Sequence, residues 1–338
     1  MRSLSLVLLV LIGACTTTGI GGNGLDASST VPATPTTSTP TTVTTSTTST
    51  TLATTTTPVT TDPASTIREI VKGLVTETGV VVAVLEETTD GYLVTTPCGN
   101  EAVVPGGTPM GEVSVVIDAG HGGEVDTGAV GANGLMEKHL NLTVAQAVEA
   151  KLIVRGVSVI LTRTADYAST LTARTALADR LNADLLLSLH HNAPTQRSSS
   201  RPGTEVFIQH DSTDSKRLGG LVWTHVVQTL SQFDVEWSAA TDSGVLSVLS
   251  TSGNDAYGIN RNPETVSALV ELGYISNPPE AALFATDAYV DSASEAVADA
   301  VQAYLETDAP GAGFVAEARV FNPQSGIGGA VCEDPPLQ

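Results

Sequence analysis

Four side chains that can bind a metal ion or move a proton stand where apolar runs of this sequence end. His121 lies in a glycine-rich stretch after the run Val113–Ile117, and His190 directly follows the run Leu185–Leu189. Glu137 comes just before an amphipathic segment. Two imidazoles and one carboxylate form a three-ligand set that suits catalytic zinc and leaves one coordination position open. These residue types therefore predict a metal site, provided that the fold brings them together.

The fourth residue, Glu271, is a carboxylate inside an otherwise apolar segment. It follows the run Ser267–Val270 and precedes Leu272. Because an unpaired buried charge is costly, a carboxylate in such surroundings is either paired or functional. Glu271 is therefore a candidate functional residue beside the three candidate ligands.

Each of these residues taken alone also has a structural explanation. A single histidine near a strand end is more often a hydrogen-bonded structural residue than a ligand. Glu137 would also suit a helix N-terminus, where a carboxylate meets the positive end of the helix dipole. The combination of two histidines and one glutamate at one edge of a sheet is what favours a metal site.

Apolar periodicity predicts the elements that must position these residues. Five runs are typical of buried strands, namely Val113–Ile117, Val157–Leu161, Asp184–Leu189, Glu205–Ile208 and Val266–Leu272. Helices are expected where apolar residues recur at three- and four-residue spacing, over about 140–152, 171–181, 216–232 and 293–306. On the second of these helices, Arg174 and Arg180 are expected to point outward.

Strands that alternate with helices predict an α/β fold. We expect a mostly parallel, twisted sheet with helices on both faces, in a single catalytic domain that follows a disordered linker. In such sheets, ligands collect at the carboxyl ends of the strands, which is where the candidate residues stand.

The polar motifs also occur in the order, and with the spacing, of a known family. They are Asp118–Gly123, Glu137-Lys138 with Asn141-Leu142, Ser188–Ala193 and Glu271–Asn277, with Leu161-Thr162-Arg163 and Leu171–Arg174 between them. Over about 113–306 the chain resembles the zinc-dependent N-acetylmuramoyl-L-alanine amidases, also called amidase type 3. Tyr274 stands where that family more commonly has phenylalanine, and His191 stands at a position that is usually small or variable.

The resemblance implies a site and a reaction. It implies Zn²⁺ as the cofactor, His121, Glu137 and His190 as the metal ligands, and Glu271 as the catalytic carboxylate. The implied reaction is hydrolysis of the amide between N-acetylmuramic acid and the L-alanine of the peptidoglycan stem peptide. Glu271 would take a proton from water and return it to the leaving amine.

Three neighbouring residues have open roles. Asp118 would either fix the tautomer of a ligand imidazole or cap the turn that follows it. His191 should point to the opposite side of its strand from His190, because side chains alternate along a strand. We therefore do not expect His191 to be a ligand, and His139 is a spare imidazole close to Glu137.

Other classes of protein fit parts of the sequence. A non-catalytic peptidoglycan-binding protein on a degenerate amidase fold would have lost a ligand, whereas all four key residues are present. A zinc peptidase is disfavoured because the sequence has no HExxH motif. A surface adhesin would account for the Thr-rich stretch but not for Glu271.

The first 66 residues have the composition of an export signal and a linker. The positive start and the short apolar run Leu4–Ala14 predict a signal peptide over 1–15. Ile12–Cys15 resembles the lipobox of bacterial lipoproteins, and ordinary cleavage with Cys15 as a bystander is the alternative. Residues 16–66 are almost entirely Thr, Ser, Pro, Ala and Val, which predicts a disordered linker. We expect an exported cell-envelope protein that touches the membrane only through such a lipid anchor.

Three further segments follow the linker. We expect a small β-containing segment over 67–110 with a turn at Asp90-Gly91, a catalytic domain over 111–308 and a tail over 309–338. Cys98 and Cys332 lie on either side of the catalytic domain, and in an oxidising compartment such a pair is expected to form a structural disulfide.

Charge limits the choice of partners. The net charge is −21, with 15 Lys and Arg against 36 Asp and Glu. Nucleic acid is therefore not expected as a partner, because phosphate binding depends on clustered Lys and Arg. The implied partner is peptidoglycan, held by specific contacts, and the protein is expected to be a monomer.

Overall fold

The structure is a computed structural model that describes residues 70–323 and 331–338. The predicted signal peptide 1–15, with Cys15, and the predicted linker 16–66 lie outside the described residues. Among the residues that are described, no helix is both long enough and apolar enough to span a bilayer.

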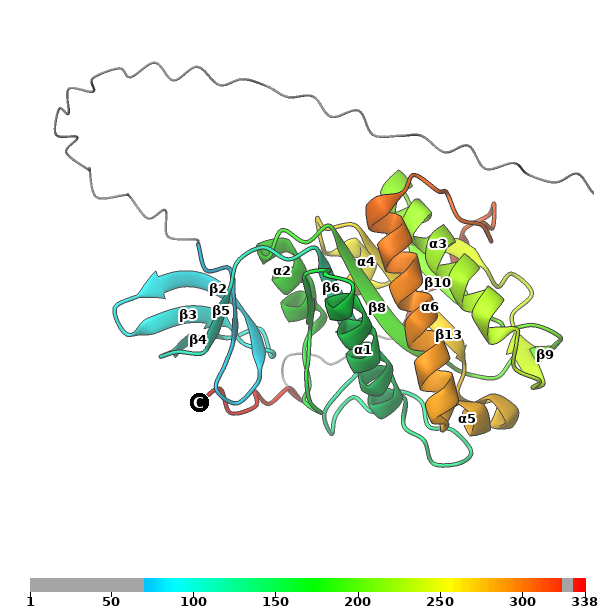
Figure 1. Ribbon diagram of the computed structural model, residues 1–338, viewed down its shortest axis with the longest axis horizontal. Helices are drawn as coiled ribbons and strands as arrows, with labels where there is room; N and C mark the ends of the chain where they lie inside the picture. The colour runs from blue at the N-terminus through cyan, green and yellow to red at the C-terminus, as the bar shows by residue number, and fades with distance from the viewer. Residues whose placement is uncertain (1–69, 324–330) are drawn as a thin grey trace, which may run out of the picture. The chain divides into compact units, whose positions relative to one another are not determined.

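A seven-stranded mixed sheet forms the centre of the described structure (Figure 1). Its strands lie in the order β14 (Arg319–Val320), β12 (Val245–Leu249), β10 (Glu205–Ile208), β13 (Ser267–Tyr274), β8 (Leu185–Asn192), β6 (Val115–Ala119) and β7 (Val159–Leu161). Within this sheet β10 and β13 run antiparallel, and the other neighbouring pairs are parallel. The expected α/β fold is confirmed, with one reversed strand pair.

The reversal has a simple cause in the connection from β8 to β10. A parallel return needs a crossover of a dozen or more residues, usually a helix. The chain from residue 193 to residue 204 holds only the short strand β9 (Arg197–Ser199), which pairs with β11 (Trp237–Ala239). Without a helix to carry it back, the chain enters β10 in the opposite direction.

Helices cover both faces of the main sheet. On one face lie α1 (Glu137–Val154), α3 (Thr213–Leu230) and α6 (Asp287–Glu306), and α5 (Pro278–Phe284) precedes α6. On the other face lie α2 (Leu171–Arg180) and α4 (Gly258–Arg261). Side-chain alternation along β6 shows the two cores, because Val115 and Ile117 join the first and Val116 joins the second.

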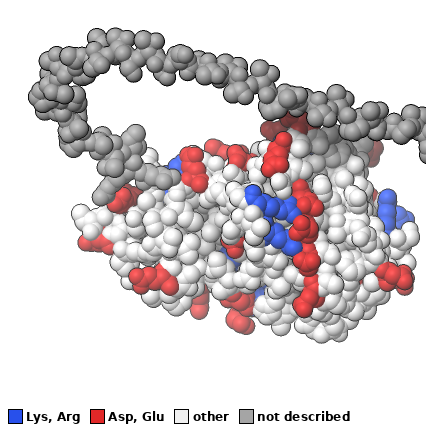
Figure 2. Space-filling view, in the orientation of Figure 1, with Lys and Arg blue, Asp and Glu red and all other residues white. Residues whose placement is uncertain are grey.

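The outer surface of α1 and α6 carries a row of ion pairs (Figure 2). Lys151 of α1 and Arg155, which directly follows α1, contact three carboxylates of α6, those of Asp291, Glu295 and Asp299. These pairs lie on the solvent side of the helix layer, so each contributes little to stability.

A second, five-stranded antiparallel sheet precedes the main one. Its strands lie in the order β4 (Glu101–Val104), β3 (Gly91–Thr95), β2 (Val81–Thr88), β1 (Gly73–Val75) and β5 (Thr108–Met110). The predicted turn at Asp90-Gly91 is confirmed and joins β2 to β3. Gly91 is required there, because its φ is +134° and a Cβ would lie 2.2 Å from the carbonyl oxygen of Val104. Val81 and Ala83 of β2 pack into the core that contains α2.

The C-terminal segment contacts both sheets. β14 extends the main sheet beside β12, and the final residues lie beside the small sheet (Figure 1). Cys332 is disulfide-bonded to Cys98, so the predicted bridge is confirmed. The carboxylate of Asp334 also accepts hydrogen bonds from the backbone amide of Cys98 at 2.7 Å and from the hydroxyl of Thr96 at 2.8 Å.

Replacing Cys98 and Cys332 together by serine is expected to lower the free energy of unfolding by about 2–4 kcal/mol. The bridge joins residues 234 positions apart, and removing it enlarges the conformational freedom of the unfolded chain. Urea unfolding of the oxidised protein and of the double variant measures the difference. Wild-type protein in reductant should behave like the variant, and an unchanged unfolding midpoint would show that the Asp334 contacts hold the segment without the bridge.

Candidate metal centre and catalytic site

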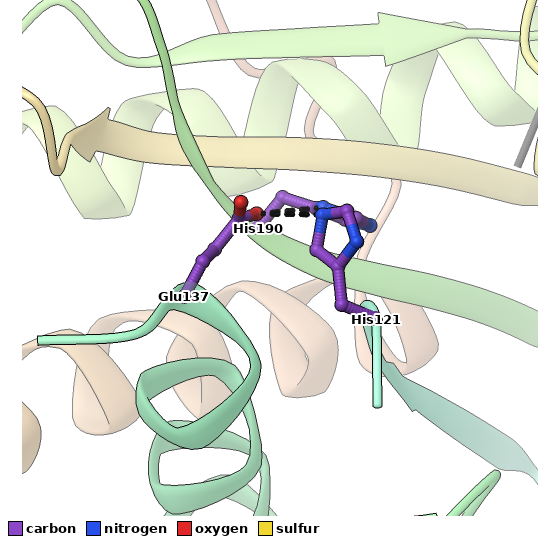
Figure 3. Close-up of side chains that lie close together, drawn as sticks. All are labelled: His121, Glu137 and His190. Carbon is purple, nitrogen blue, oxygen red and sulfur yellow. Dashed lines mark hydrogen bonds and ion pairs between the residues drawn. The ribbon is translucent and has the colours of Figure 1, made fainter. Parts of the chain in front are cut away.

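His121, Glu137 and His190 converge at the carboxyl edge of the main sheet (Figure 3). Their ligand atoms all lie within 4.8 Å of one another. Oε1 of Glu137 lies 3.1 Å from Nε2 of His121 and 3.0 Å from Nδ1 of His190. The structure thus brings together the three residues that the sequence singled out, and their side chains could hold a metal ion.

The loop after β6 is built to admit two imidazoles. His121 has a φ of +63°, a left-handed conformation that is uncommon for a residue with a side chain. A Cβ at Gly120 would lie 2.2 Å from Nε2 of His190. Glycine at this position therefore leaves the space that the second imidazole occupies, and the turn directs His121 toward it.

Asp126 fixes the other side of the His121 ring. Oδ1 of Asp126 lies 2.6 Å from Nδ1 of His121, which leaves Nε2 facing Glu137 and His190. Such an outer contact sets the tautomer and orientation of a ligand imidazole. Asp126 is not among the residues predicted from the sequence, where its only signal is its place as an acidic residue in the loop that follows His121. Asp118 accepts hydrogen bonds from the side chains of Thr162, Arg174 and Ser188. Among the described residues it bonds neither to a candidate imidazole nor to a backbone amide of the turn, so it takes neither of the two roles considered for it.

Asp118 instead forms a buried ion pair with Arg174. Oδ1 of Asp118 lies 2.6 Å from Nη1 of Arg174, and both side chains are almost fully buried. Arg174 also donates to the backbone carbonyls of Ala119 and His121, each at 2.8 Å. The prediction that Arg174 points outward is wrong, because the guanidinium reaches inward to hold the loop that carries His121. Arg180 is half-buried and donates to the carbonyl of Val84.

Asp118→Asn is expected to lower the free energy of unfolding by about 3 kcal/mol at pH 7, because it leaves the charge of Arg174 buried and unpaired. Burial would raise the pKa of Asp118, but the Arg174 guanidinium and the hydroxyls of Ser188 and Thr162 lower it to about 2. A carboxyl whose pKa is depressed in the folded state stabilises the fold above its unfolded pKa, about 3.9, and loses that contribution as the pH falls.

The destabilisation should therefore shrink between about pH 4 and pH 2, as the wild-type carboxylate is protonated. Urea unfolding of both proteins at pH 7 and at several values below pH 4 measures this. Equal destabilisation at every pH would contradict the assigned role of the Asp118 carboxylate.

Glu137 is the first residue of α1 and is buried among donors. Its Oε2 accepts a hydrogen bond from the amide of Ala129 at 2.8 Å, and its Oε1 accepts one from the amide of His191 at 3.2 Å. Burial would raise the pKa of Glu137, but the imidazoles of His121 and His190 hold it well below its usual range. Burial would lower the pKa of His121, but Asp126 and Glu137 raise it to about 10. The carboxylates of Asp126 and Glu137 thus stabilise a positive charge at the His121 ring.

His191 and His139 lie outside this group. Nδ1 of His191 lies 2.7 Å from Oδ1 of Asn141, and its Nε2 lies 2.6 Å from the hydroxyl of Tyr289. Burial lowers the pKa of His191 to about 3, so the ring is neutral. The predicted opposite orientation of His191 is confirmed, because both ring nitrogens are bonded within the helix layer. His139 is exposed and lies 3.3 Å from Asp166.

Glu271 stands next to the candidate ligands in the sheet. In β13 it lies opposite His190 of β8 on one side and opposite Glu205 of β10 on the other. Its Oε2 is buried and has no hydrogen-bond partner among the described residues. Burial, and then the carboxylates of Glu137 and Glu205, raise the pKa of Glu271 well above its usual range. A buried carboxylate oxygen without a partner is costly, which marks Glu271 as a candidate functional residue.

Comparison with known proteins places this site in a family. Residues 115–303, more than half of the chain, match the family model described as N-acetylmuramoyl-L-alanine amidase. The chain belongs to this family. As a member, the protein is an amidase that hydrolyses amide bonds of the bacterial cell wall, and the enzyme class expected from the sequence is confirmed.

Individual relatives each match somewhat more than half of this chain. An uncharacterized protein of Bacillus subtilis, YqiI, is 36% identical over 187 residues, which cover 55% of this chain and 79% of the relative. The N-acetylmuramoyl-L-alanine amidase AmiA of Salmonella typhimurium is 30% identical over 205 residues, covering 51% of this chain and 69% of AmiA. The solved structure of the amidase AmiC2 of Nostoc punctiforme is 32% identical, with a TM-score of 0.49, and covers 58% of this chain and 98% of that one.

The candidate site of the amidase opens into a cavity of about 890 Å³. His121, His190 and Glu271 line one part of it, and residues of α2 and α4 line another. Cys98 of the small sheet and Asn322 of the C-terminal segment also reach its wall. A volume of this size can hold a short peptide segment, and Glu137 lies buried behind the imidazoles.

Proposed function

We propose that this amidase hydrolyses the bond between N-acetylmuramic acid and L-alanine of the stem peptide, with Zn²⁺ held by His121, Glu137 and His190. Membership in the family supports an amide of peptidoglycan as the substrate. The convergence of the three ligand atoms is the observation that carries the metal proposal. Two imidazoles and a carboxylate are a donor set that suits zinc.

The surroundings of the three residues fit a metal ion. Hydrogen bonds from neighbouring groups orient two of the ligand side chains. Asp126 bonds to the ring of His121, and the backbone amide of Ala129 donates to Glu137. A Cβ at Gly128 would lie 2.6 Å from Oε2 of Glu137 and 2.7 Å from Cδ2 of His121, so a side chain there would displace both ligands. Fixed outer contacts of this kind are typical of metal sites.

Glu271 is the proposed general base and acid. When bound, zinc supplies Lewis-acid chemistry, which makes water more acidic and a carbonyl carbon more electrophilic. The carboxylate of Glu271 takes a proton from the attacking water and then gives it to the nitrogen of the leaving amine. The raised pKa of Glu271 supports this role, because a group that both accepts and returns a proton works best with a pKa near the operating pH.

A non-catalytic peptidoglycan-binding role is not favoured. Such a protein would be free to lose a ligand or the general base, whereas all four residues are present and lie together. The partnerless oxygen of Glu271 also costs stability, and a binding role gives it no use.

The remaining assignments concern the context of the catalytic domain. We propose that residues 1–15 act as a signal peptide and 16–66 as a linker, that 67–110 and 309–338 flank the catalytic domain 111–308, and that the protein works as an exported monomer at the cell envelope. The mass of the mature protein distinguishes lipidation of Cys15 from ordinary cleavage.

Digestion of purified peptidoglycan tests the proposed bond. We expect stem peptides with a free N-terminal L-alanine, identified by mass analysis, and intact glycan strands. A chelator should stop their release and added zinc should restore it. Shortened glycan fragments, or peptides cut between amino acids, would contradict the proposal.

A further inference from the structure

The C-terminal segment places an arginine near the proposed general base. Arg319 lies in β14, beyond the family-matched region that ends at residue 303. β14 pairs in parallel with β12, with Arg319 opposite Val248. From there the guanidinium reaches the carboxylate of Glu205 in β10, and it also donates to both carboxylate oxygens of Asp242, at 2.7 Å and 3.0 Å.

Glu205 is the direct neighbour of Glu271 across the strand pair. The two residues are opposite each other in the antiparallel pairing of β10 and β13, so their side chains leave the same face of the sheet. Like charges in such a pair repel each other. Glu205 is only 1% exposed, so water cannot screen this repulsion. A charge of opposite sign is needed beside Glu205, and Arg319 supplies it.

Both carboxylate oxygens of Glu205 have hydrogen-bond partners, whereas Oε2 of Glu271 has none among the described residues. Oε1 of Glu205 bonds to Arg319, and Oε2 accepts hydrogen bonds from Nδ2 of Asn192 at 2.7 Å and from the hydroxyl of Tyr274 at 3.0 Å. Oε2 of Glu271 has no partner within the described parts of the chain. Arg319, Asn192 and Tyr274 thus all donate to Glu205, and Oε2 of Glu271 stays without a partner among the described residues.

We propose that Arg319 is a positioning residue of the active site, which neutralises Glu205 so that Glu271 keeps its free oxygen at the cavity. This inference rests on the proposed role of Glu271. Without Arg319, Glu205 would carry an unpaired charge directly opposite Glu271. The two carboxylates would then move apart or compete for the donors of Tyr274 and Asn192. Either change would move the carboxylate of Glu271 from its place at the cavity.

The anchoring of Arg319 is consistent with such a role. Asp242 accepts hydrogen bonds from Nε and Nη2 of Arg319, and Nη2 also donates to Glu205, so one guanidinium serves two carboxylates at once. The segment that contains β14 is thus a working part of the catalytic unit, although it lies outside the region that matches the family.

A double-mutant cycle tests the proposal. Arg319→Met, Glu205→Gln and the double variant are compared with wild type for kcat and KM of stem-peptide release, zinc content and urea unfolding. Because a displacement of about 1 Å can cost ~100-fold in rate, Arg319→Met should lower kcat at least about tenfold, with little change in zinc content. In the Glu205→Gln background the same change should cost less than about twofold, because no charge remains to be neutralised.

Arg155→Met is the matched control. It also removes an arginine that pairs with two carboxylates, Glu295 and Asp299, but on the helix surface, and kcat should be unaffected. A folded Arg319→Met variant with wild-type kcat would overturn the inference, and so would a loss of kcat that Glu205→Gln fails to restore. Release of stem peptides by the wild type tests the proposed function separately, because that result does not depend on Arg319.

Discussion

Glu271→Gln is expected to lower kcat for stem-peptide release by about 10³-fold and to leave the zinc content unchanged. The amide nearly preserves the size of the side chain but cannot take a proton from water at neutral pH. Because no described residue bonds to Oε2 of Glu271, the substitution breaks no hydrogen bond at that atom. Kinetics on purified peptidoglycan and metal analysis of the same preparation measure the two quantities.

Glu264→Gln is the control for this experiment. Glu264 is exposed and lies shortly before β13, the strand that carries Glu271, so its loss should leave both rate and metal content unchanged. If Glu271→Gln kept a rate within a few-fold of wild type, Glu271 would not be the general base. If it lost zinc as well as activity, Glu271 would act on the metal site instead.

His190→Ala is expected to abolish stem-peptide release because the protein no longer retains zinc. With His190 gone, only His121 and Glu137 remain of the three ligand atoms that converge in the structure. Two ligands hold zinc far more weakly than three, so purified protein should contain substoichiometric metal. Metal analysis after dialysis measures the loss, and urea unfolding shows whether the variant still folds.

His210→Ala is the matched control for the histidine. His210 is exposed, and its Nε2 lies 4.0 Å from the carboxylate of Asp211, at the limit of an ion pair. Its replacement should leave zinc content and rate unchanged. Full zinc occupancy in folded His190→Ala would contradict the proposed ligand set.

The convergence of the three candidate ligands was predictable from the sequence because parallel strands end at the same edge of a sheet. His121 follows β6 and His190 lies near the end of β8, and these two strands are neighbours. The sequence leaves two roles open for Glu137, because a glutamate at a helix start also suits the helix dipole. In the structure Glu137 begins α1, and its carboxylate turns to both imidazoles.

The residues that orient His121 and its loop could not be predicted in the same way. Asp126 lies in a loop without regular structure, so no periodicity indicates which way its side chain points. Arg174 was expected to face solvent because charged residues on helices usually do. Its burial depends on Asp118 and on the backbone carbonyls of the His121 loop, which only the tertiary fold brings within reach.

The contact of Arg319 with Glu205 could not be predicted from the sequence either. Its partner Glu205 lies more than a hundred positions earlier in the sequence, and β14 is a two-residue strand that no apolar pattern marks. The antiparallel pairing of β10 with β13 was also unexpected, yet it sets Glu205 opposite Glu271. Interactions of this kind follow from strand order and register, which local sequence patterns do not contain.

The most direct test of the account is a zinc titration of metal-free protein, with new N-terminal alanine counted as the product. Metal-free protein is expected to release no alanine termini from peptidoglycan. The rate should then rise with added zinc and level off at about one ion per chain, as expected for a three-ligand catalytic site. A metal-free protein that works at the full rate, or a zinc-dependent product without N-terminal alanine, would contradict it.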